Sequence, residues 1–265
     1  MAGVFRIPGV LGASALEFPI DKGTLCLNPS FSPRSIPPRL APMASQQQAR
    51  PSSPQPVGNG PFELAVGQLT FDAEGQESPT SAYFSRVVHW PGGISGVTLG
   101  RGYDMGTRTA TVVAEDLVAA GLDGKRAAAF AAGAGMSGSD AKAFVEKNKA
   151  ALGQISPEVQ KALFERIFPT YVAAAVKNYD KWTLGETDRL PWTALDAPIR
   201  DVLVDFVYQG FTKGGNPMKK GMRNDYDELI LYIETTAVLV GYEAGRRRAP
   251  YLRRRKPAKG APSAQ

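Results

Sequence analysis

The balance of apolar and polar positions changes at about residue 60 of this 265-residue chain. Residues 27–60 are rich in Pro, Ser, Gln and Asn, as in the run 51–54. Such a segment buries too little apolar surface to offset the entropy that ordering costs. We therefore expect residues 1–60 to form a disordered leader and linker, either a delivery or docking segment or a ragged terminus. Residues 61–265 are expected to form one globular domain.

From residue 61 onward the spacing of apolar positions predicts mainly helices. Helical periodicity, capping residues and terminating glycines predict helices at 63–73, 123–132, 139–152, 156–167, 169–181, 196–210 and 226–245. A further helix is expected to begin after a cap at Thr109 or Thr111 and to end at Gly121. Alternating positions predict strands at 83–90 and 96–102, on either side of a Pro-Gly-Gly turn. We expect an α+β, mainly helical domain with a small β-hairpin lobe.

Single residues decide several of these boundaries. Pro169 has no backbone N–H, so we expect a new helix to begin there. Gly75 is suited to end the first helix, which leaves Glu74 at the helix end, facing the hairpin. The last helix is expected to run through the arginines that begin at Arg246.

The segment 96–104 reads GVTLGRGYD and holds the groups with the most chemical interest. Alternating glycines let a hairpin pass close to a ligand, because a missing Cβ removes both steric bulk and the restriction on φ. Between and after these glycines lie one hydroxyl, Thr98, and one carboxylate, Asp104. With Glu74 as a carboxylic acid on the other side, these groups are the minimum set for hydrolysing a glycosidic bond.

Each of the three candidates also has a plain structural interpretation. Glu74 could be a solvated acid at a helix end, Asp104 a turn-forming residue, and Thr98 a strand position that only packs. Two neighbouring acids compete with Glu74 for the catalytic role. We expect Glu77, which lies past the glycine, to point to solvent, and Asp72 to face away from Glu74.

The chain contains one cysteine and one histidine, which excludes several classes of enzyme. An intrachain disulfide is impossible, and zinc hydrolases need more His or Cys ligands than are present. A catalytic triad would have to use His89. Acid–base chemistry is therefore expected to fall mainly on carboxylates, with no metal and no cofactor.

Positive charge gathers at the C-terminal end of the chain, whose formal net charge is +6. The last twenty residues contain eight Arg or Lys and no acid, so we expect a basic tail suited to a polyanionic partner. No stretch is long and apolar enough to span a membrane. Residues 1–20 lack a clean apolar core, so we expect no Sec signal.

The spacing of Glu74, Thr98 and Asp104 resembles that of phage-type lysozymes, and more closely that of the pesticin-like branch of bacteriocin muramidase domains. There, a glutamate before a glycine ends the first helix, and a Gly-x-Thr-x-Gly-x-Gly hairpin follows about two dozen residues later. In the pesticin-like branch the catalytic aspartate comes shortly after the threonine. The resemblance covers residues 62–255 and is densest at 70–106.

The resemblance implies a lysozyme-like fold and a muramidase, which cleaves the β-1,4 bond between N-acetylmuramic acid and N-acetylglucosamine. Glu74 would be the general acid, while Asp104 and Thr98 would activate a water, with inversion the expected outcome. Gln209 and Tyr103 would contact substrate. Arg248 would be the arginine that pairs with the catalytic glutamate, although the residue that is usually acidic after it is a tyrosine here.

Alternative functions remain at this point. A lysozyme-like module could bind peptidoglycan glycan strands without cutting them, and the basic tail could bind nucleic acid, although no recognition motif accompanies it. The muramidase is expected to be a monomer with no specific nucleic-acid partner and no membrane partner. It would be made in the cytoplasm and act on the wall, as an injected antibacterial toxin with an immunity protein or secretion carrier, or as a phage endolysin.

Overall fold

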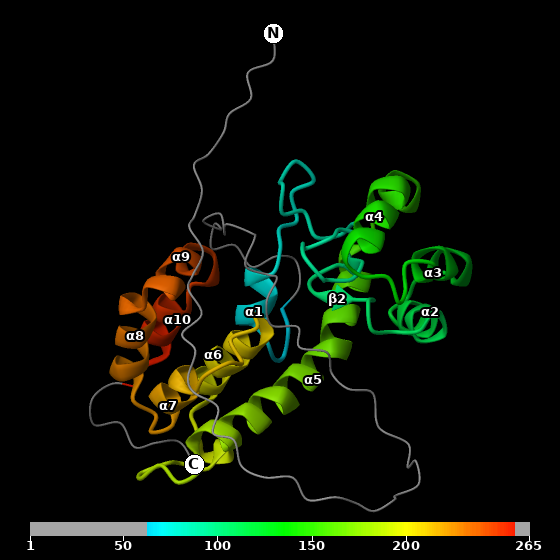
Figure 1. The fold of residues 1–265 in the computed structure, drawn as a ribbon. Helices are drawn as coiled ribbons and strands as arrows, with labels where there is room; N and C mark the ends of the chain where they lie inside the picture. Colours follow the sequence, from blue (N-terminus) through cyan, green and yellow to red (C-terminus); the bar gives the residue numbers. More distant parts are fainter. Residues whose placement is uncertain (1–62, 258–265) are drawn as a thin grey trace, which may run out of the picture. The chain divides into compact units, whose positions relative to one another are not determined.

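Helices make up most of residues 63–257, the part of the chain that the structure, a computed structural model, describes. Figure 1 shows these elements in chain order: α1 (Gln68–Ala73), β1 (Thr98–Leu99), β2 (Tyr103–Asp104), α2 (Ala110–Ala119), α3 (Gly124–Ala131), α4 (Gly138–Leu152), α5 (Pro157–Thr183), the 3₁₀ helix η2 (Trp192–Ala194), α6 (Ala197–Tyr208), α7 (Asn216–Gly221), α8 (Tyr226–Thr235), α9 (Ala237–Arg246) and α10 (Arg248–Arg255). The prediction of a mainly helical α+β fold is confirmed. The expected leader, residues 1–60, lies outside the described residues.

Local signals account for several helix boundaries. The helices α3, α4 and α6 begin and end close to their predicted bounds. Of the two candidate caps for α2, Thr109 is the one used, and its side chain accepts a hydrogen bond from the first turn. The first helix, α1, begins later than predicted because Gly67 adopts a left-handed conformation with φ of 80°.

The two strands of the hairpin lie on either side of the glycine-flanked turn 100–102. The strands β1 and β2 are antiparallel, with Thr98 opposite Asp104. The prediction of one strand over 96–102 is wrong, because the hairpin turn lies at 100–102 and not at the Pro-Gly-Gly segment. The prediction of a strand over 83–90 is also wrong. That segment makes isolated bridges to three separate places, Gln76, Gln154 and Thr98, so no continuous ladder forms.

Pro169 does not interrupt α5, which is one helix of 27 residues, and the predicted break there is wrong. A proline in a helix removes the hydrogen bond to the carbonyl four residues earlier. That carbonyl belongs to Glu165, an exposed position where water can replace the lost donor. Phe168, just before the proline, and Tyr171, just after it, both pack against the ring of Tyr208 of α6. Tertiary packing therefore outweighs the local signal.

The predicted helix over 226–245 is divided into α8 and α9 at Thr236, where the backbone is extended. A second break follows at Arg247, which adopts a left-handed conformation between α9 and α10. The prediction of one helix that continues through the arginines is therefore wrong. The two breaks allow both Arg246 and Arg248 to lie in the protein interior.

The long helix α5 connects the parts of the domain. It contacts α6 and α7 along one part of its length and α2 and β2 along another (Figure 1). Aromatic rings fill the space between these elements: Phe71 of α1 lies 5.1 Å from Phe164, and Tyr171 lies 4.0 Å from Tyr208 of α6, measured between ring centroids. This packing fixes the C-terminal end of α1 against α5 and α6.

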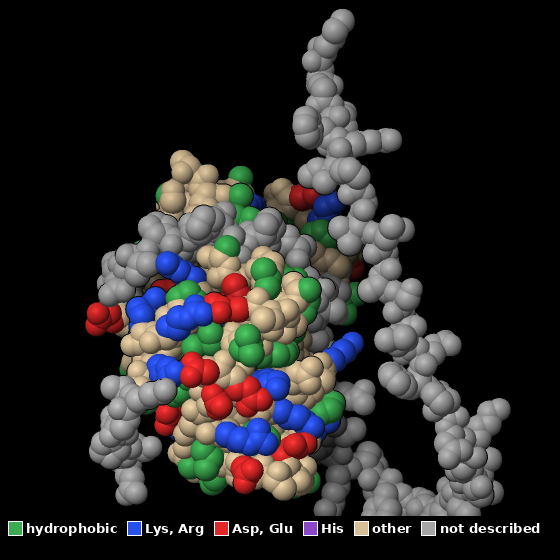
Figure 2. Space-filling model, turned by 90° about the vertical axis from the view of Figure 1, so that its left-hand side faces the viewer, with side chains coloured by type: hydrophobic (Ala, Val, Ile, Leu, Met, Phe, Trp, Pro, Cys, Tyr) green, Lys and Arg blue, Asp and Glu red, His purple; other side chains and the backbone are tan. Residues whose placement is uncertain are grey.

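The C-terminal basic residues divide into buried and exposed ones. Arg246 and Arg248 are buried, whereas Arg253, Arg254, Arg255 and Lys256 are exposed, with Arg253 paired to Glu234 and Lys256 to Asp227. Figure 2 shows basic and acidic side chains interspersed on the viewed face of the molecule. The expectation of a basic surface tail is therefore wrong for Arg246 and Arg248, and Lys259 lies outside the described residues. Among residues 63–257, no helix is long and apolar enough to cross a membrane.

Candidate catalytic site

Glu74 is the C-cap residue of α1, and its side chain is turned inward, with an exposed fraction of 8%. The next residue, Gly75, lets the chain leave the helix in close contact with Ser85, because a Cβ at this position would lie 2.5 Å from the Ser85 Cβ. The helix end and the glycine therefore fix where the Glu74 carboxylate is presented. Glu74 is not a solvated acid.

Arg246, at the end of α9, forms an ion pair with Glu74 through Nη2. The resemblance implied such an arginine but assigned it to Arg248, and that assignment is wrong. The left-handed turn at Arg247 directs the two arginines differently, so Arg246 reaches Glu74 while Arg248 pairs with residues of α6 and α9.

A buried carboxylate, Asp205 of α6, holds the other side of Arg246. Its Oδ1 lies 2.9 Å from Arg246 Nη1, and its Oδ2 lies 2.7 Å from Arg248 Nε. Arg248 also contacts Glu243 Oε1 at 2.8 Å. Burial opposes ionisation of Asp205, but the charges of the two arginines outweigh it and lower the pKa of Asp205. Asp205 therefore stays ionised in the protein interior.

Thr98 and Asp104 face each other across the hairpin. Side chains directly opposite in an antiparallel pair lie on the same face, with Cβ atoms about 4.5–5.5 Å apart. Asp104 accepts hydrogen bonds from the backbone N–H of Gly106 at 2.6 Å and of Gly96 at 3.2 Å. The Thr98 hydroxyl is 3% exposed and donates to the Gly96 carbonyl at 3.3 Å. The carboxylate is thus oriented by the loop around it, while its side chain is only half-buried.

Gly96 is required by this arrangement. A Cβ there would lie 2.2 Å from Asp104 Oδ1 and 2.4 Å from the Gly106 nitrogen. The glycine pattern therefore serves a close approach between two parts of the loop that holds Asp104.

Tyr171 on α5 lies within electrostatic range of both halves of the site. Burial raises the pKa of Tyr171, and the negative charges of Glu74 and Asp104 raise it further. Both carboxylates therefore lie within electrostatic range of one phenol, although they come from different elements. Tyr171 packs against the ring of Tyr208. The charge of Glu74 also contributes to raising the pKa of Tyr208, after the larger effects of burial and Tyr171.

The hairpin tip is attached to α1 by Arg101. Its guanidinium lies 4.0 Å from the ring centroid of Phe71, and its Nη2 lies 2.8 Å from Glu77 Oε1. On the other side, the Tyr208 hydroxyl donates to the Arg101 carbonyl at 2.6 Å. The hairpin with Thr98 is therefore held against the helix with Glu74.

Glu77 does not point to solvent, contrary to the expectation. It pairs with Arg101 and with Arg86 at 2.9 Å, and it accepts a hydrogen bond from Gln160 at 2.6 Å. Burial opposes its ionisation, but the bond and charge of Arg101, with Gln160 and Arg86, lower the pKa of Glu77. A carboxylate held in this way is a poor proton donor. Asp72 is exposed and accepts from Gln68 at 2.8 Å.

The three predicted substrate contacts are buried in the structure. Tyr103 is 1% exposed and donates to Asp116 at 2.6 Å, so it offers no ring face to a sugar. Gln209 is 5% exposed, and its amide oxygen accepts from Arg248, whose side chain is fully buried. The interior position of Tyr103, Gln209 and Arg248 corrects the expectation of direct contact. Gln209 and Arg248 belong instead to the ionic network around Asp205.

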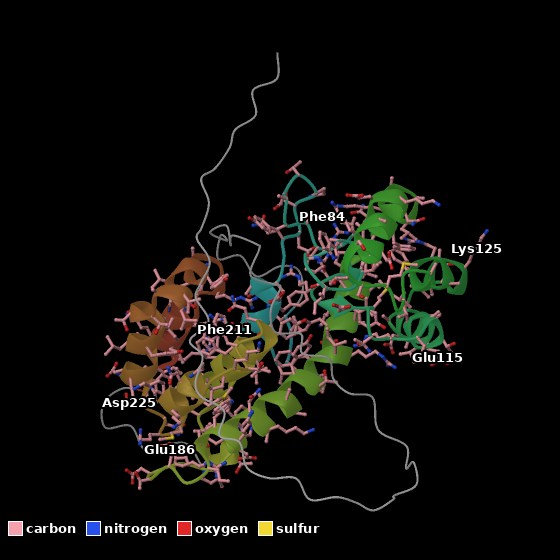
Figure 3. The ribbon with its side chains drawn as sticks, in the orientation of Figure 1. Phe84, Glu115, Lys125, Glu186, Phe211 and Asp225 are labelled. Carbon is pink, nitrogen blue, oxygen red and sulfur yellow. The ribbon has the colours of Figure 1, made fainter. Side chains whose placement is uncertain are left out.

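Sequence reasoning missed Arg246, Asp205 and Tyr171. A signal existed for Asp205, because an acid inside the apolar run 202–207 of a helix must be buried with a partner. Arg246 lay in a run of arginines that is typical of a solvated surface. Phe211, labelled in Figure 3, packs edge-on against the rings of Phe206 of α6 and Tyr242 of α9.

No cluster of three or more His, Cys, Asp or Glu suited to a metal ion occurs within residues 63–257.

Residues 67–238 match a protein family described as "Domain of unknown function (DUF8812)". The matched region contains Glu74, Thr98, Asp104 and Asp205, and it ends before Arg246. No curated protein matches the chain.

Proposed function

The chain belongs to the DUF8812 family, and we propose that it is a peptidoglycan hydrolase, a muramidase that acts by general acid and base catalysis. The observation that carries this proposal is that Arg101 holds the hairpin with Thr98 and Asp104 against α1, the helix that ends at Glu74. The first carboxylate comes from a helix end and the second from a hairpin, and Thr98 lies directly opposite the second. Two carboxylates from different elements are what glycoside hydrolysis requires.

Glu74 is proposed as the general acid, which gives its proton to the oxygen between two sugars as that bond breaks. Its position supports this role, because a nearly buried carboxyl group is shielded from bulk water. Arg246 makes the contact that the resemblance to phage-type lysozymes implies for the catalytic glutamate. The arginine lies two residues earlier than expected.

Asp104, with Thr98 beside it, is proposed to orient and activate a water on the opposite face of the sugar ring. The backbone N–H groups of Gly96 and Gly106 hold the carboxylate in one orientation, which favours positioning. In this mechanism water adds at the anomeric carbon, so the configuration is inverted. Proton NMR of the first product reads the anomer formed.

The substrate would be the glycan strand of peptidoglycan, and the site of action the bacterial wall. A role as an antibacterial toxin, with an immunity protein or a secretion carrier, and a role as a phage endolysin both agree with this chemistry. The mechanism uses no cofactor and no metal.

The proposal is tested by turbidity loss and by release of reducing ends from purified peptidoglycan, with wild type beside Glu74→Gln. Gln keeps the shape of the side chain but has no proton to give, so we expect a rate at least about 100-fold lower. The matched control is Asp72→Asn, an exposed acid on the same helix, which should keep wild-type activity. Equal activity of wild type and Glu74→Gln would remove Glu74 from the acid role.

One observation favours a second candidate, a module that binds wall glycans without cutting them. Both oxygens of Asp104 accept backbone hydrogen bonds, which is also what a purely structural aspartate would do. That function predicts that wild type and Glu74→Gln both pellet with peptidoglycan and that neither releases reducing ends.

A further inference from the structure

The ionic network behind Glu74 holds more acidic than basic groups. Two guanidinium groups, from Arg246 and Arg248, face three carboxyl groups, from Glu74, Asp205 and Glu243. The side chains are between 0% and 15% exposed. An uncompensated negative charge in such surroundings is costly, so the network favours holding one proton.

Asp205 is the member of the network that contacts both arginines. Each of its oxygens faces a different guanidinium group, at 2.9 Å and 2.7 Å, and its side chain is fully buried. The arginine that pairs with Glu74 is therefore shared with a second carboxylate. The negative charge of Asp205, held against the same guanidinium group, offsets part of the attraction between Arg246 and an ionised Glu74.

We infer that Asp205 is a positioning residue of the proposed site: it fixes the Arg246 guanidinium beside Glu74 and takes up part of its charge, which leaves Glu74 able to carry a proton. The inference rests on the proposed function of Glu74 as the acid. It explains how a carboxyl group beside an arginine can still serve as a proton donor. The direction of the pKa of Asp205, which is lowered, agrees with its keeping the negative charge.

Titratable and charged groups near Glu74 come from several elements. Arg246 of α9 pairs with it, and the charge of Glu74 acts on Tyr171 of α5 and Tyr208 of α6. Asp104 of the hairpin acts on the same Tyr171, and Asp205 of α6, Glu243 of α9 and Arg248 of α10 complete the ionic network. Glu243 is the other acid that can take the proton, because burial raises its pKa. It contacts Arg248 rather than the arginine that holds Glu74. Asp205 shares Arg246 with Glu74, each carboxylate on a different nitrogen of the guanidinium group.

The experiment is a carbon-13 NMR titration of the Glu74 carboxyl group in the full chain, assigned with Glu74→Gln, in wild type and in Asp205→Asn. Without the charge of Asp205, Arg246 serves Glu74 alone, so the titration midpoint of Glu74 should be lower in Asp205→Asn than in wild type. The alkaline limb of the pH–activity profile should move down with it. The matched control is Asp201→Asn, which removes an acid one turn away on α6 that bonds Tyr251 and should move neither.

The outcomes separate this inference from the proposed function. If the midpoint falls but wild type hydrolyses no peptidoglycan, the sharing of Arg246 is supported and the proposed function fails. If wild type hydrolyses peptidoglycan but Asp205→Asn leaves both midpoint and pH profile unchanged, the inference is overturned. An equal shift in Asp201→Asn would also overturn it, because the effect would then be one of net charge.

A measurement on wild type alone covers the case in which Asp205→Asn does not fold. The carboxyl groups of Asp205 and Glu74 are followed in the same titration. The inference requires Asp205 to remain ionised over the range in which Glu74 takes up its proton. If Asp205 is protonated before Glu74, the inference is overturned.

Discussion

Arg246 forms an ion pair with Glu74 across 172 positions of sequence, and both side chains are less than 10% exposed. The contact joins the end of the first helix of the domain to the end of α9. Its other neighbour, Asp205, comes from α6. One guanidinium group therefore connects three helices at the point where the proposed acid lies.

Replacing Arg246 with Met should strongly destabilise the protein, because Glu74 and Asp205 would lose a shared partner in buried surroundings. Removing one member of a buried ion pair costs about 3–5 kcal/mol in the free energy of unfolding. Urea denaturation followed by circular dichroism measures this loss. The control Arg253→Ala removes an exposed pair with Glu234 and should leave the urea midpoint unchanged.

Asp104→Asn should abolish the activation of water. The Asn oxygen can accept from only one of the backbone N–H groups of Gly96 and Gly106, because these bond different oxygens of Asp104. The expected loss in kcat on peptidoglycan is about 10²–10⁴-fold, with a modest fall in the melting temperature from the one lost hydrogen bond. Retained activity together with a lower melting temperature would instead assign Asp104 a purely structural role.

Gly96→Ala should distort the loop that holds Asp104, since the new Cβ would lie 2.2 Å from the Asp104 carboxylate and 2.4 Å from the Gly106 nitrogen. Forcing such a group into a packed region costs about 1–3 kcal/mol, and activity should fall with it. Thermal unfolding and reducing-end release measure the two effects. Gly124→Ala, at the start of α3 with open space around it, is the control and should be neutral or slightly stabilising.

Glu77 should make the stability of the protein sensitive to acid. Its pKa is lowered in the folded state from an ordinary value of 4.5, so its contribution is present above that value and is lost as the pH falls through the folded pKa. Glu77→Gln should therefore be less stable than wild type near neutral pH, and the difference should shrink below about pH 4.5.

Urea denaturation between pH 7 and pH 3 checks this dependence. Glu115→Gln, an exposed acid on α2 that is labelled in Figure 3, serves as the control and should follow wild type across the range. A stability difference for Glu77→Gln that is the same at every pH would contradict the assigned ion pairs.

Local sequence signals predicted the elements of the site better than their connections. The Glu74-Gly75 boundary and the hairpin with Thr98 and Asp104 depend on helix termination and glycine spacing within a few residues. By contrast, the strand expected at 83–90 and the break expected at Pro169 depended on whether distant segments supply partners or packing. In both cases the neighbouring structure decided against the local preference.

By itself, the sequence determined a mainly helical α+β domain, because helix periodicity and capping act over one or two turns of the chain. It also placed Glu74 at the end of the first helix and Thr98 and Asp104 in one glycine-rich segment. Only the tertiary structure decided that Arg246 rather than Arg248 meets Glu74, and that Asp205 lies between the two arginines. The physical reason is that the breaks at Thr236 and Arg247 set the directions of the Arg246 and Arg248 side chains. In addition, buried charges are stable only where helices distant in sequence bring opposite charges together.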